Sequence, residues 1–202
     1  MIAIIDYDAG NIKSVQKACE ALSGETVKVT GDGSEILAAD RVILPGVGAF
    51  GSAMERLIER GLDDVVRTVA DSGRPFLGIC LGLQLLFEES EESPNVAGLG
   101  VLSGRILRIP EEGGLRVPHI GWNSLTFPNE GRLFDGVGEE PFVYFVHSYY
   151  LKAEDAAIVR ARTAYGVEID ASVESGNVFA TQFHPEKSGK TGLAILKNFL
   201  AV

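Results

Sequence analysis

Short apolar runs alternate with amphipathic stretches along the first half of the chain. The run 2–5 predicts a buried strand, and residues 11–23 follow it with apolar positions three and four apart, which is the spacing of one helical face. The remaining elements predicted in this half are strands at 26–30, 41–44 and 75–79, a long helix that opens at Ser52, and a helix at 83–89. Because strands and helices alternate, this half predicts a mainly parallel sheet with helices on both faces.

The long helix carries two local signals. Ser52 with Glu55 three residues later forms a capping-box pattern and predicts where the helix starts. Its apolar positions, from Met54 to Val69, are predicted to face inward. Gly61 weakens the middle of the helix, so we expect a kink or break there.

The second half has a different texture, because glycine- and proline-rich loops join successive strands. These strands are predicted at 101–109, 142–146, 158–163, 167–173 and 178–183. A closing helix over 191–200 is predicted to bury Leu193, Leu196, Phe199 and Leu200. The sequence contains no repeat and no linker long enough to divide it. We therefore predict one α/β domain over residues 1–202, a three-layer, flavodoxin-like fold with a mostly parallel central sheet and an antiparallel extension.

Charge and composition narrow the function. The net charge of −10 disfavours nucleic-acid binding, because phosphate neutralisation needs clustered Lys and Arg. The acidic run 88–92 is interpreted as a solvated helix end. No signal peptide is visible, and the longest uncharged apolar run, 75–87, is shorter than the roughly 20 residues of a membrane span. Two cysteines without a disulfide-scaffold or metal-ligand pattern favour a reducing cytosol, so we expect a soluble cytoplasmic protein that binds no metal or cofactor.

The run Gly78-Ile79-Cys80-Leu81-Gly82 lies directly between an apolar strand and a helical segment. This is the pattern of a nucleophile elbow, in which flanking glycines avoid collision at a sharp turn. The following helix would point its N-terminus at the sulfur and favour thiolate over thiol, and the Leu81 N–H would serve an oxyanion. We therefore interpret Cys80 as a nucleophile rather than a buried core residue. Cys19, on the apolar stripe of the first helix, is interpreted as core packing.

The segment His184-Pro185-Glu186 supplies a base and a carboxylate. Proline biases the residue before it toward extended backbone, in which residues two apart project to the same side. Glu186 is therefore predicted to orient His184, which gives a Cys-His-Glu triad with Cys80. The segment leaves an apolar strand at its C-terminal end, where catalytic residues of open α/β sheets gather. That position favours the triad over a surface histidine beside a surface glutamate. His119 and His147 receive no role.

Two glycine patterns resemble phosphate sites. Residues 46–51 read G-x-G-x-x-G, but Asp71, the acid at the dinucleotide spacing, lies near the end of the same helix rather than at a strand tip. We interpret residues 45–48 instead as a flexible loop beside Cys80 that presents backbone N–H groups to an oxyanion. The run 189–191 resembles the end of a phosphate-binding loop, but His184 stands where that pattern needs glycine.

These motifs together resemble the class I, or triad, glutamine amidotransferases, through GICLGLQ at 78–84 and FHPE at 183–186. More narrowly, the chain resembles the glutaminase subunits of imidazole glycerol phosphate synthase. That resemblance rests on residues 5–7 with 10–11, and on 44–50, 118–123, 147–149 and 186–189. The blocks spread over nearly the whole chain. One departure is Asp8, which stands where relatives commonly have glycine.

The resemblance implies a role for each matching residue. Cys80 would attack the side-chain amide of glutamine, His184 would protonate the leaving ammonia and then activate water, and Glu186 would orient His184. The oxyanion site would consist of Gly46, Val47, Gly48 and Leu81. The amino-acid end of glutamine would be held by Gln84, Ser148 and Tyr149.

The resemblance also implies a partner. Ammonia would pass to a separate (β/α)8-barrel subunit in a heterodimer, which would use it to form imidazole glycerol phosphate and aminoimidazole carboxamide ribonucleotide in histidine biosynthesis. A dependent subunit agrees with the lack of a convincing phosphate motif in the sequence. From the chain alone Trp122 could equally pack in the core, but the resemblance makes it an interface anchor, a role in which tryptophan is enriched. The other interface residues implied are Asn11, Pro118 and Asn123.

Three other functions share part of the pattern. The first is a glutaminase subunit of another amidotransferase, which the PHIGWN and DYDAGN blocks disfavour. The second is a stand-alone cysteine hydrolase such as a peptidase, which would cleave peptides without any second protein. The third is a nucleotide-binding module without catalysis, which would bind a dinucleotide tightly.

Overall fold

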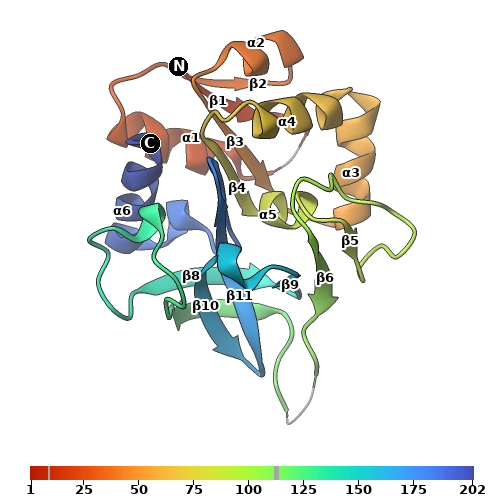
Figure 1. Ribbon diagram of the computed structural model, residues 1–202, viewed down its shortest axis with the longest axis vertical. Helices are drawn as coiled ribbons and strands as arrows, with labels where there is room; N and C mark the ends of the chain where they lie inside the picture. Colours follow the sequence, from red (N-terminus) through yellow and green to blue (C-terminus); the bar gives the residue numbers. More distant parts are fainter. Residues whose placement is uncertain (9, 112–113) are drawn as a thin grey trace.

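The computed structural model describes residues 1–8, 10–111 and 114–202. At its centre is a seven-stranded sheet in the order β10-β11-β12-β4-β3-β1-β2 (Figure 1). Strands β2, β1, β3, β4 and β12 run parallel, and β11 and β10 extend the sheet antiparallel. The seven strands are β1 (Ile2–Ile5), β2 (Val27–Thr30), β3 (Arg41–Gly46), β4 (Phe76–Cys80), β10 (Val159–Tyr165), β11 (Val167–Ser175) and β12 (Val178–Thr181).

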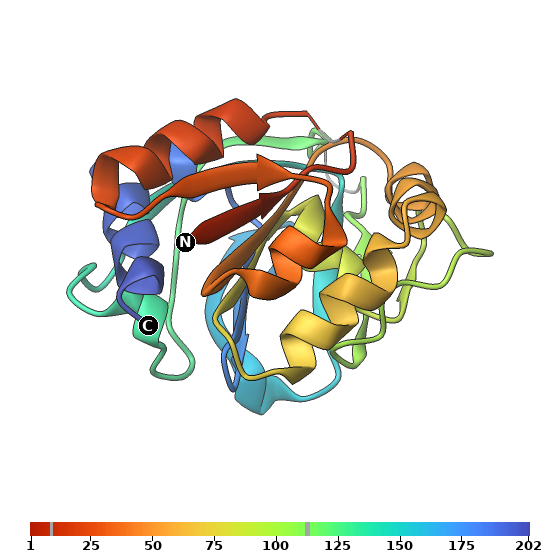
Figure 2. The ribbon, with the colours of Figure 1, turned by 90° about the horizontal axis from the view of Figure 1, so that it is seen from above.

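Helices cover both faces of this sheet (Figure 2). One face packs against α1 (Ile12–Leu22) and α6 (Gly189–Leu200), and the other against α2 (Gly33–Ala38), α3 (Phe50–Glu59), α4 (Leu62–Asp71) and α5 (Leu81–Leu85). The side chains of β1 alternate between the two cores, because successive strand residues face opposite ways. The predicted three-layer α/β class with an antiparallel extension is therefore confirmed. None of the described helices is long and apolar enough to cross a membrane.

The parallel strand order β2-β1-β3-β4-β12 is that of a flavodoxin-like sheet. In such sheets ligands bind outside the carboxyl ends of the strands. Here the carboxyl ends of β3, β4 and β12 lie next to one another, because Gly46 pairs with Cys80 and Thr181 pairs with Ile79. Segments that are more than a hundred residues apart in sequence therefore meet at one edge.

Two smaller sheets complete the second half of the chain. One contains β5 (Glu89–Ser90), β6 (Gly104–Arg108) and β9 (Tyr149–Ala153), and the other is a ribbon of β7 (His119–Ser124) and β8 (Phe142–His147). Short 3-10 helices occupy Arg132–Phe134, Ala156–Ile158 and Pro185–Lys187. The sequence did not predict α2, β7 or β9. The helix α2 is under two turns long, and β7 mixes His, Gly and Asn into its strand, so α2 and β7 show no clear periodicity.

The predicted start of the long helix at Ser52 is wrong. Helix α3 begins at Phe50, whose backbone N–H donates to Glu92 Oε2 over 2.8 Å. The N–H of Gly51 donates to Ser93 Oγ over 3.1 Å. Two side chains from a distant loop therefore satisfy the free N–H groups of the first turn, which a local capping box would otherwise bind.

The acidic run 88–92 is exposed to solvent at Glu88, Glu89 and Glu91 as predicted, but it is not the predicted helix end. The preceding helix α5 ends before it, and Glu89–Ser90 forms strand β5. Glu88 Oε2 accepts a hydrogen bond from the N–H of Gly104, and Glu91 Oε2 accepts one from the N–H of Arg108, at 3.0 and 2.7 Å. These two carboxylates flank β5, and both accept backbone N–H groups of β6, so they hold the two strands together.

Two further helix predictions had opposite outcomes. The break expected at Gly61 is confirmed, since Gly61 adopts a left-handed φ of 64° between α3 and α4. The burial of Leu193 is wrong, because its side chain is 38% exposed while Ile195 and Leu196 lie in the core. Apolar residues surround this part of α6, and their spacing alone does not identify the buried side.

Candidate active site

Cys80 ends β4 on a sharp strand-to-helix turn. Its φ of 55° lies in the left-handed region, a conformation that costs a residue with a side chain on the order of 1–3 kcal/mol and is concentrated at functional sites. A Cβ on Gly82 would lie 1.9 Å from the carbonyl oxygen of Leu44, and one on Gly78 would lie 2.8 Å from that of Gly82. The predicted elbow is therefore built as expected, with no room for side chains at the flanking glycines.

The helix after the elbow is shorter than predicted. α5 spans only Leu81–Leu85, so the positive field at the sulfur comes from N–H groups of one turn rather than from a long helix. Cys19, in contrast, is fully buried on α1 among apolar side chains, as predicted. Burial raises the pKa of the Cys19 thiol to about 12.

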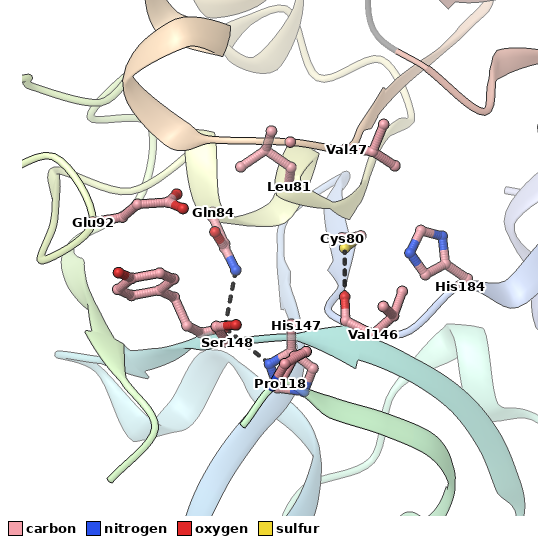
Figure 3. A pocket seen from close by; sticks show the side chains of 12 residues that line it. Val47, Cys80, Leu81, Gln84, Glu92, Pro118, Val146, His147, Ser148 and His184 are labelled. Carbon is pink, nitrogen blue, oxygen red and sulfur yellow. Dashed lines mark hydrogen bonds between the residues drawn. The ribbon is translucent and has the colours of Figure 1, made fainter. Parts of the chain in front are cut away.

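Cys80 faces a cavity of about 340 Å³ at the carboxyl ends of β3 and β4 (Figure 3). This size suits a small ligand. The cavity is lined by Val47, Gly48, Cys80, Leu81, Gln84, Glu92, Pro118, Val146, His147, Ser148, Tyr149 and His184. Most of the predicted catalytic, oxyanion and substrate residues thus share one lining. Gly46 lies at the end of β3 behind it, and Pro118, expected at a partner interface, is at the cavity.

His184 and Glu186 form a buried pair beside the cavity. Nδ1 of His184 lies 2.8 Å from Glu186 Oε1, and both side chains are almost fully buried. The sequence argument for this contact was wrong in one respect, because residues 185–187 form a 3-10 helix rather than an extended segment. Nδ1 is committed to the carboxylate. Nε2, which makes no hydrogen bond to the described residues, is left for the sulfur and a substrate.

The imidazole of His184 is held in its charged form at neutral pH. Burial disfavours the charge, but the neighbouring Cys80 sulfur and the Glu186 carboxylate outweigh it, so the pKa of His184 rises to about 9. An imidazolium next to a cysteine favours the thiolate, and it also carries the proton that a leaving group would need. The site is therefore equipped for nucleophilic attack followed by proton donation.

Asn11 contacts Glu186 of the predicted triad, although it was expected at a partner interface. Its Nδ2 donates to Glu186 Oε1 over 2.6 Å, the same oxygen that contacts His184. Asparagine at a helix N-cap normally binds the N–H groups of its own helix. Asn11 has a left-handed φ of 68° and makes no such bond, so its amide serves the distant carboxylate instead.

Trp122 is on the surface, so the core-packing alternative is excluded. It is 55% exposed on the β7–β8 ribbon, where Ile120 and Phe142 are 59% and 56% exposed. Trp122 pairs with Tyr144 in the ribbon register, and their rings meet edge to face. We call Ile120, Trp122, Phe142 and Tyr144 the ribbon face. Asn123 lies on the other side of β7, where its amide donates to the carbonyl oxygen of Ala164 over 3.0 Å.

His119 and His147 form a second buried pair, on the inner side of the same ribbon. Nδ1 of His147 lies 2.9 Å from the carbonyl oxygen of Tyr149, which can only accept, so this nitrogen carries the hydrogen. Nε2 of His147 then accepts from Nδ1 of His119 over 3.0 Å. Burial lowers the pKa of His119 to about 4 and that of His147 to about 3, so both rings are neutral at pH 7.

Several residues at the site were missed by the sequence reasoning, and Val146, which lines the cavity, is one of them. Glu92 lines the cavity, Gln182 contacts Cys80, and His147 stands between the cavity and His119. Glu92 was hidden in an acidic run. Gln182 directly precedes the FHPE motif and His147 begins the block 147–149, but nothing in the pattern around either residue marks it as a site residue.

Asp8, the departure from the usual glycine, has a left-handed φ of 64°. This backbone conformation explains why glycine suits the position. The loop is held by α3, because Arg60 pairs with the Asp8 carboxylate and Arg56 Nη1 donates to the Asp8 carbonyl oxygen over 2.6 Å. Ala9, in the same sequence block, lies outside the described residues.

Residues 3–202 match the family model for glutamine amidotransferase class-I. The chain is 54% identical to imidazole glycerol phosphate synthase subunit HisH of Moorella thermoacetica, over 98% of this chain and 93% of that protein. It is 50% identical to the subunit of the same name from Methanothermobacter thermautotrophicus, over 100% and 98%. A solved glutamine amidotransferase superposes with a TM-score of 0.77 at 22% identity, covering 100% of this chain and 98% of the other. A glutamine amidotransferase from Thermotoga maritima gives 0.67 at 14% identity, over 98% and 95%, so the fold is shared.

Proposed function

This chain belongs to the class I glutamine amidotransferase family, and on that premise we propose that it hydrolyses glutamine to glutamate and ammonia through Cys80, His184 and Glu186. The observation that carries the proposal is the convergence of two distant chain segments at one cavity. A strained cysteine from β4 meets an imidazole that follows β12, and the imidazole is braced by a buried carboxylate. This is the arrangement that nucleophilic acyl transfer needs.

The reaction runs through a thioester. The Cys80 thiolate attacks the side-chain carbonyl carbon of glutamine, a C–S bond forms, and the carbonyl electron pair moves to oxygen. The His184 imidazolium then gives its proton to the amide nitrogen, the C–N bond breaks, and ammonia leaves. Neutral His184 next takes a proton from water, whose oxygen attacks the thioester carbon, and the thiolate departs from glutamate.

The oxyanion would be stabilised by backbone N–H groups on both sides of the sulfur. One donor would be the N–H of Leu81, the first residue of α5. The others would come from Val47 and Gly48, which line the facing wall of the cavity. Gly46 supports this loop from the end of β3, where it pairs with Cys80. Donors of this kind act most strongly in a site that excludes water.

The amino-acid end of glutamine would lie toward Gln84 and Ser148, which line the cavity away from His184 (Figure 3), and toward Tyr149, which belongs to the same lining. Glu92 brings a carboxylate to the same lining, and we add it to this group as the partner of the substrate ammonium. Glu92 Oε2 accepts the N–H of Phe50, which holds the carboxylate in place. Recognition of a zwitterion is therefore shared between neutral polar groups and one anion.

The ammonia would be delivered to a (β/α)8-barrel synthase subunit in a heterodimer, for imidazole glycerol phosphate formation in histidine biosynthesis. The full-length similarity to subunits with the name HisH supports this step. The ribbon face is the proposed contact, because exposed aromatic and aliphatic side chains in one patch are typical of interaction sites. Pro118 lies next to the ribbon and reaches the cavity, so it would connect the contact with the site.

A glutamate-release assay tests the proposal, with the purified chain alone and with the barrel subunit. We expect very slow hydrolysis by the chain alone, strong activation by the partner, and no activity from Cys80→Ala at unchanged fold and partner affinity. Loss of the fold in Cys80→Ala would return Cys80 to a packing role. Robust peptide cleavage without a partner would favour a stand-alone hydrolase, and tight dinucleotide binding would favour a nucleotide module.

A further inference from the structure

Gln182 lies directly after β12 and two residues before His184, and its side chain is fully buried. Its backbone N–H donates to the carbonyl oxygen of Ala171 over 2.9 Å, which fixes the main chain to β11. The side chain then reaches the nucleophile, with Nε2 lying 3.8 Å from Cys80 Sγ. That separation is in hydrogen-bond range for sulfur, whose radius is larger than that of oxygen.

The orientation of this amide is determined by a chain of hydrogen bonds. The chain starts at the carbonyl oxygen of Tyr149, which can only accept and which receives Gln84 Nε2 over 3.0 Å. The second hydrogen of Gln84 Nε2 faces Gln182 Oε1 over 3.1 Å. Because Oε1 of Gln182 is thereby occupied as an acceptor, its NH2 group must point at the sulfur.

A second contact to the sulfur has the opposite effect. The carbonyl oxygen of Val146 lies 3.9 Å from Cys80 Sγ, and it can accept an S–H hydrogen but repels a sulfur anion. On its own this carbonyl would favour the neutral thiol. A donor on the sulfur is therefore needed to offset it, and Gln182 is a neutral group placed to do so.

We propose that Gln182 donates its side-chain N–H to Cys80 Sγ and stabilises the thiolate form of the nucleophile. This inference rests on the proposed role of Cys80 in the reaction. The amide approaches the sulfur from the end of β12 and His184 from the segment that follows it, so anion stabilisation is divided between a neutral dipole and a positive charge. A neutral donor stabilises the anion without competing for the proton that His184 must deliver.

Other titratable groups near the sulfur do not supply this effect. Burial raises the pKa of Tyr7 far above its usual value, and the Tyr7 hydroxyl donates to the carbonyl oxygen of Pro45. Burial lowers the pKa of His147 to about 3, so this ring is neutral. Glu92, elsewhere in the lining, bears a negative charge that would oppose the thiolate. Among the residues that the structure describes, the donors available to the anion are therefore His184, the α5 N–H groups and Gln182.

The test is the rate at which iodoacetamide alkylates Cys80 across pH 5 to 10, followed by mass spectrometry of the Cys80 peptide. The measurement needs neither glutamine nor a partner. Gln182→Glu keeps the shape but places a carboxylate at the sulfur, and Gln182→Met removes the donor at similar volume. We expect alkylation at pH 7 to slow by about tenfold in Gln182→Met, the scale of one hydrogen bond to a charged group, and by more in Gln182→Glu. The midpoint of each profile should move to higher pH.

Ser172→Ala is the matched control. It removes another fully buried side-chain hydrogen bond, from Ser172 Oγ to the carbonyl oxygen of Ala180, without touching the sulfur. Its alkylation profile should coincide with that of the unaltered chain. If all three variants shift the profile equally, or if none does, Gln182 is only a packing residue and the inference is overturned.

A readout on the unaltered chain covers the case in which a variant fails to fold. The side-chain amide signal of Gln182 in ¹⁵N NMR should move as Cys80 titrates, while that of Asn198, bonded to the carbonyl oxygens of Leu133 and Asp135, should stay. A stationary Gln182 signal would overturn the inference. Glutamine hydrolysis is measured separately. If the Gln182 variants shift the alkylation profile but the unaltered chain hydrolyses no glutamine, only the proposed function is refuted.

Discussion

The side-chain amide of Asn11 donates to Oε1 of Glu186 over 2.6 Å, and the residues are 175 positions apart. The same oxygen lies 2.8 Å from Nδ1 of His184. A residue at the start of α1 is thus in direct contact with the carboxylate that orients the imidazole. The contact joins the start of α1 to the segment just before α6, and these two helices pack against each other.

Asn11 should therefore affect turnover. Replacing Asn11 with Ala removes one donor from a buried carboxylate, and we expect kcat of the partner-bound enzyme to fall by about tenfold. Asn11→Asp should be worse, because it places a second negative charge against Glu186. Gln16→Ala, which loses only a contact to Glu20 on the exposed side of α1, is the control. Normal kcat with weakened partner binding would assign Asn11 to the interface alone.

Glu186→Gln should move the pH profile of hydrolysis. In the intact site the pKa of His184 is about 9, and the carboxylate contributes to that rise. Its removal lowers the pKa, so the imidazolium that we propose as the proton donor to ammonia is lost at lower pH. We expect the alkaline limb of the kcat profile to shift to lower pH and kcat to drop by about tenfold or more. An unchanged alkaline limb would show that another group sets it.

The His119–His147 pair should make the chain sensitive to acid. Their folded pKa values, about 4 and about 3, are below the ordinary 6.5, so the unfolded chain binds more protons between pH 6.5 and 4. Stability therefore falls as pH drops through this window, by at most about 1.4 kcal/mol per pH unit for each ring. His184 acts in the opposite sense, because its raised pKa adds stability that is lost as pH rises through about 9.

Urea unfolding of the partner-free chain at pH 7, 6 and 5 measures this slope. His119→Phe keeps the stack between Phe145 and Tyr165 but cannot titrate, so its free energy of unfolding should depend less on pH than that of the original chain. Parallel slopes for the two proteins would contradict the assignment of a depressed pKa to His119.

Trp122→Ala should weaken assembly more than folding. The side chain is more than half exposed, so truncation leaves the core intact, while a central aromatic anchor contributes about 2 kcal/mol or more to binding. That figure corresponds to a roughly thirtyfold higher dissociation constant, measurable by calorimetry with the barrel subunit. Ile58→Ala on α3 is the control. Ile58 was predicted to face inward, but it is equally exposed at 55%, so its truncation should leave the affinity unchanged.

Gly82→Ala should prevent formation of the elbow. The added methyl would lie 1.9 Å from the carbonyl oxygen of Leu44, which is backbone of the neighbouring strand β3 and cannot move aside as a flexible side chain could. We expect a loss of at least about 3 kcal/mol of folding stability, or no folded protein, by circular dichroism and thermal melting. Gly24→Ala, whose Cβ would meet nothing within 4 Å, should fold normally.

The sequence alone was sufficient for several local features of this protein. Strand–helix alternation predicted the parallel half of the sheet, because buried strands and amphipathic helices leave periodic patterns in the chain. The glycines around Cys80 predicted the elbow, because a tight turn leaves no room for side chains two residues before and two residues after the nucleophile. The HPE run predicted a histidine beside a glutamate, although the backbone between them is a 3-10 turn. Motif resemblance identified the family.

The tertiary structure decided whatever depends on residues that are distant in the chain. The N–H groups of α3 are bound by Glu92 and Ser93, the triad carboxylate by Asn11, and the sulfur by Gln182. Each is an ordinary polar residue whose partner lies 42 or more positions away, so no local periodicity or spacing records the contact. Such pairings exist only once the strands have been ordered side by side, because the sheet brings their carboxyl ends together and the desolvated polar groups there must find partners.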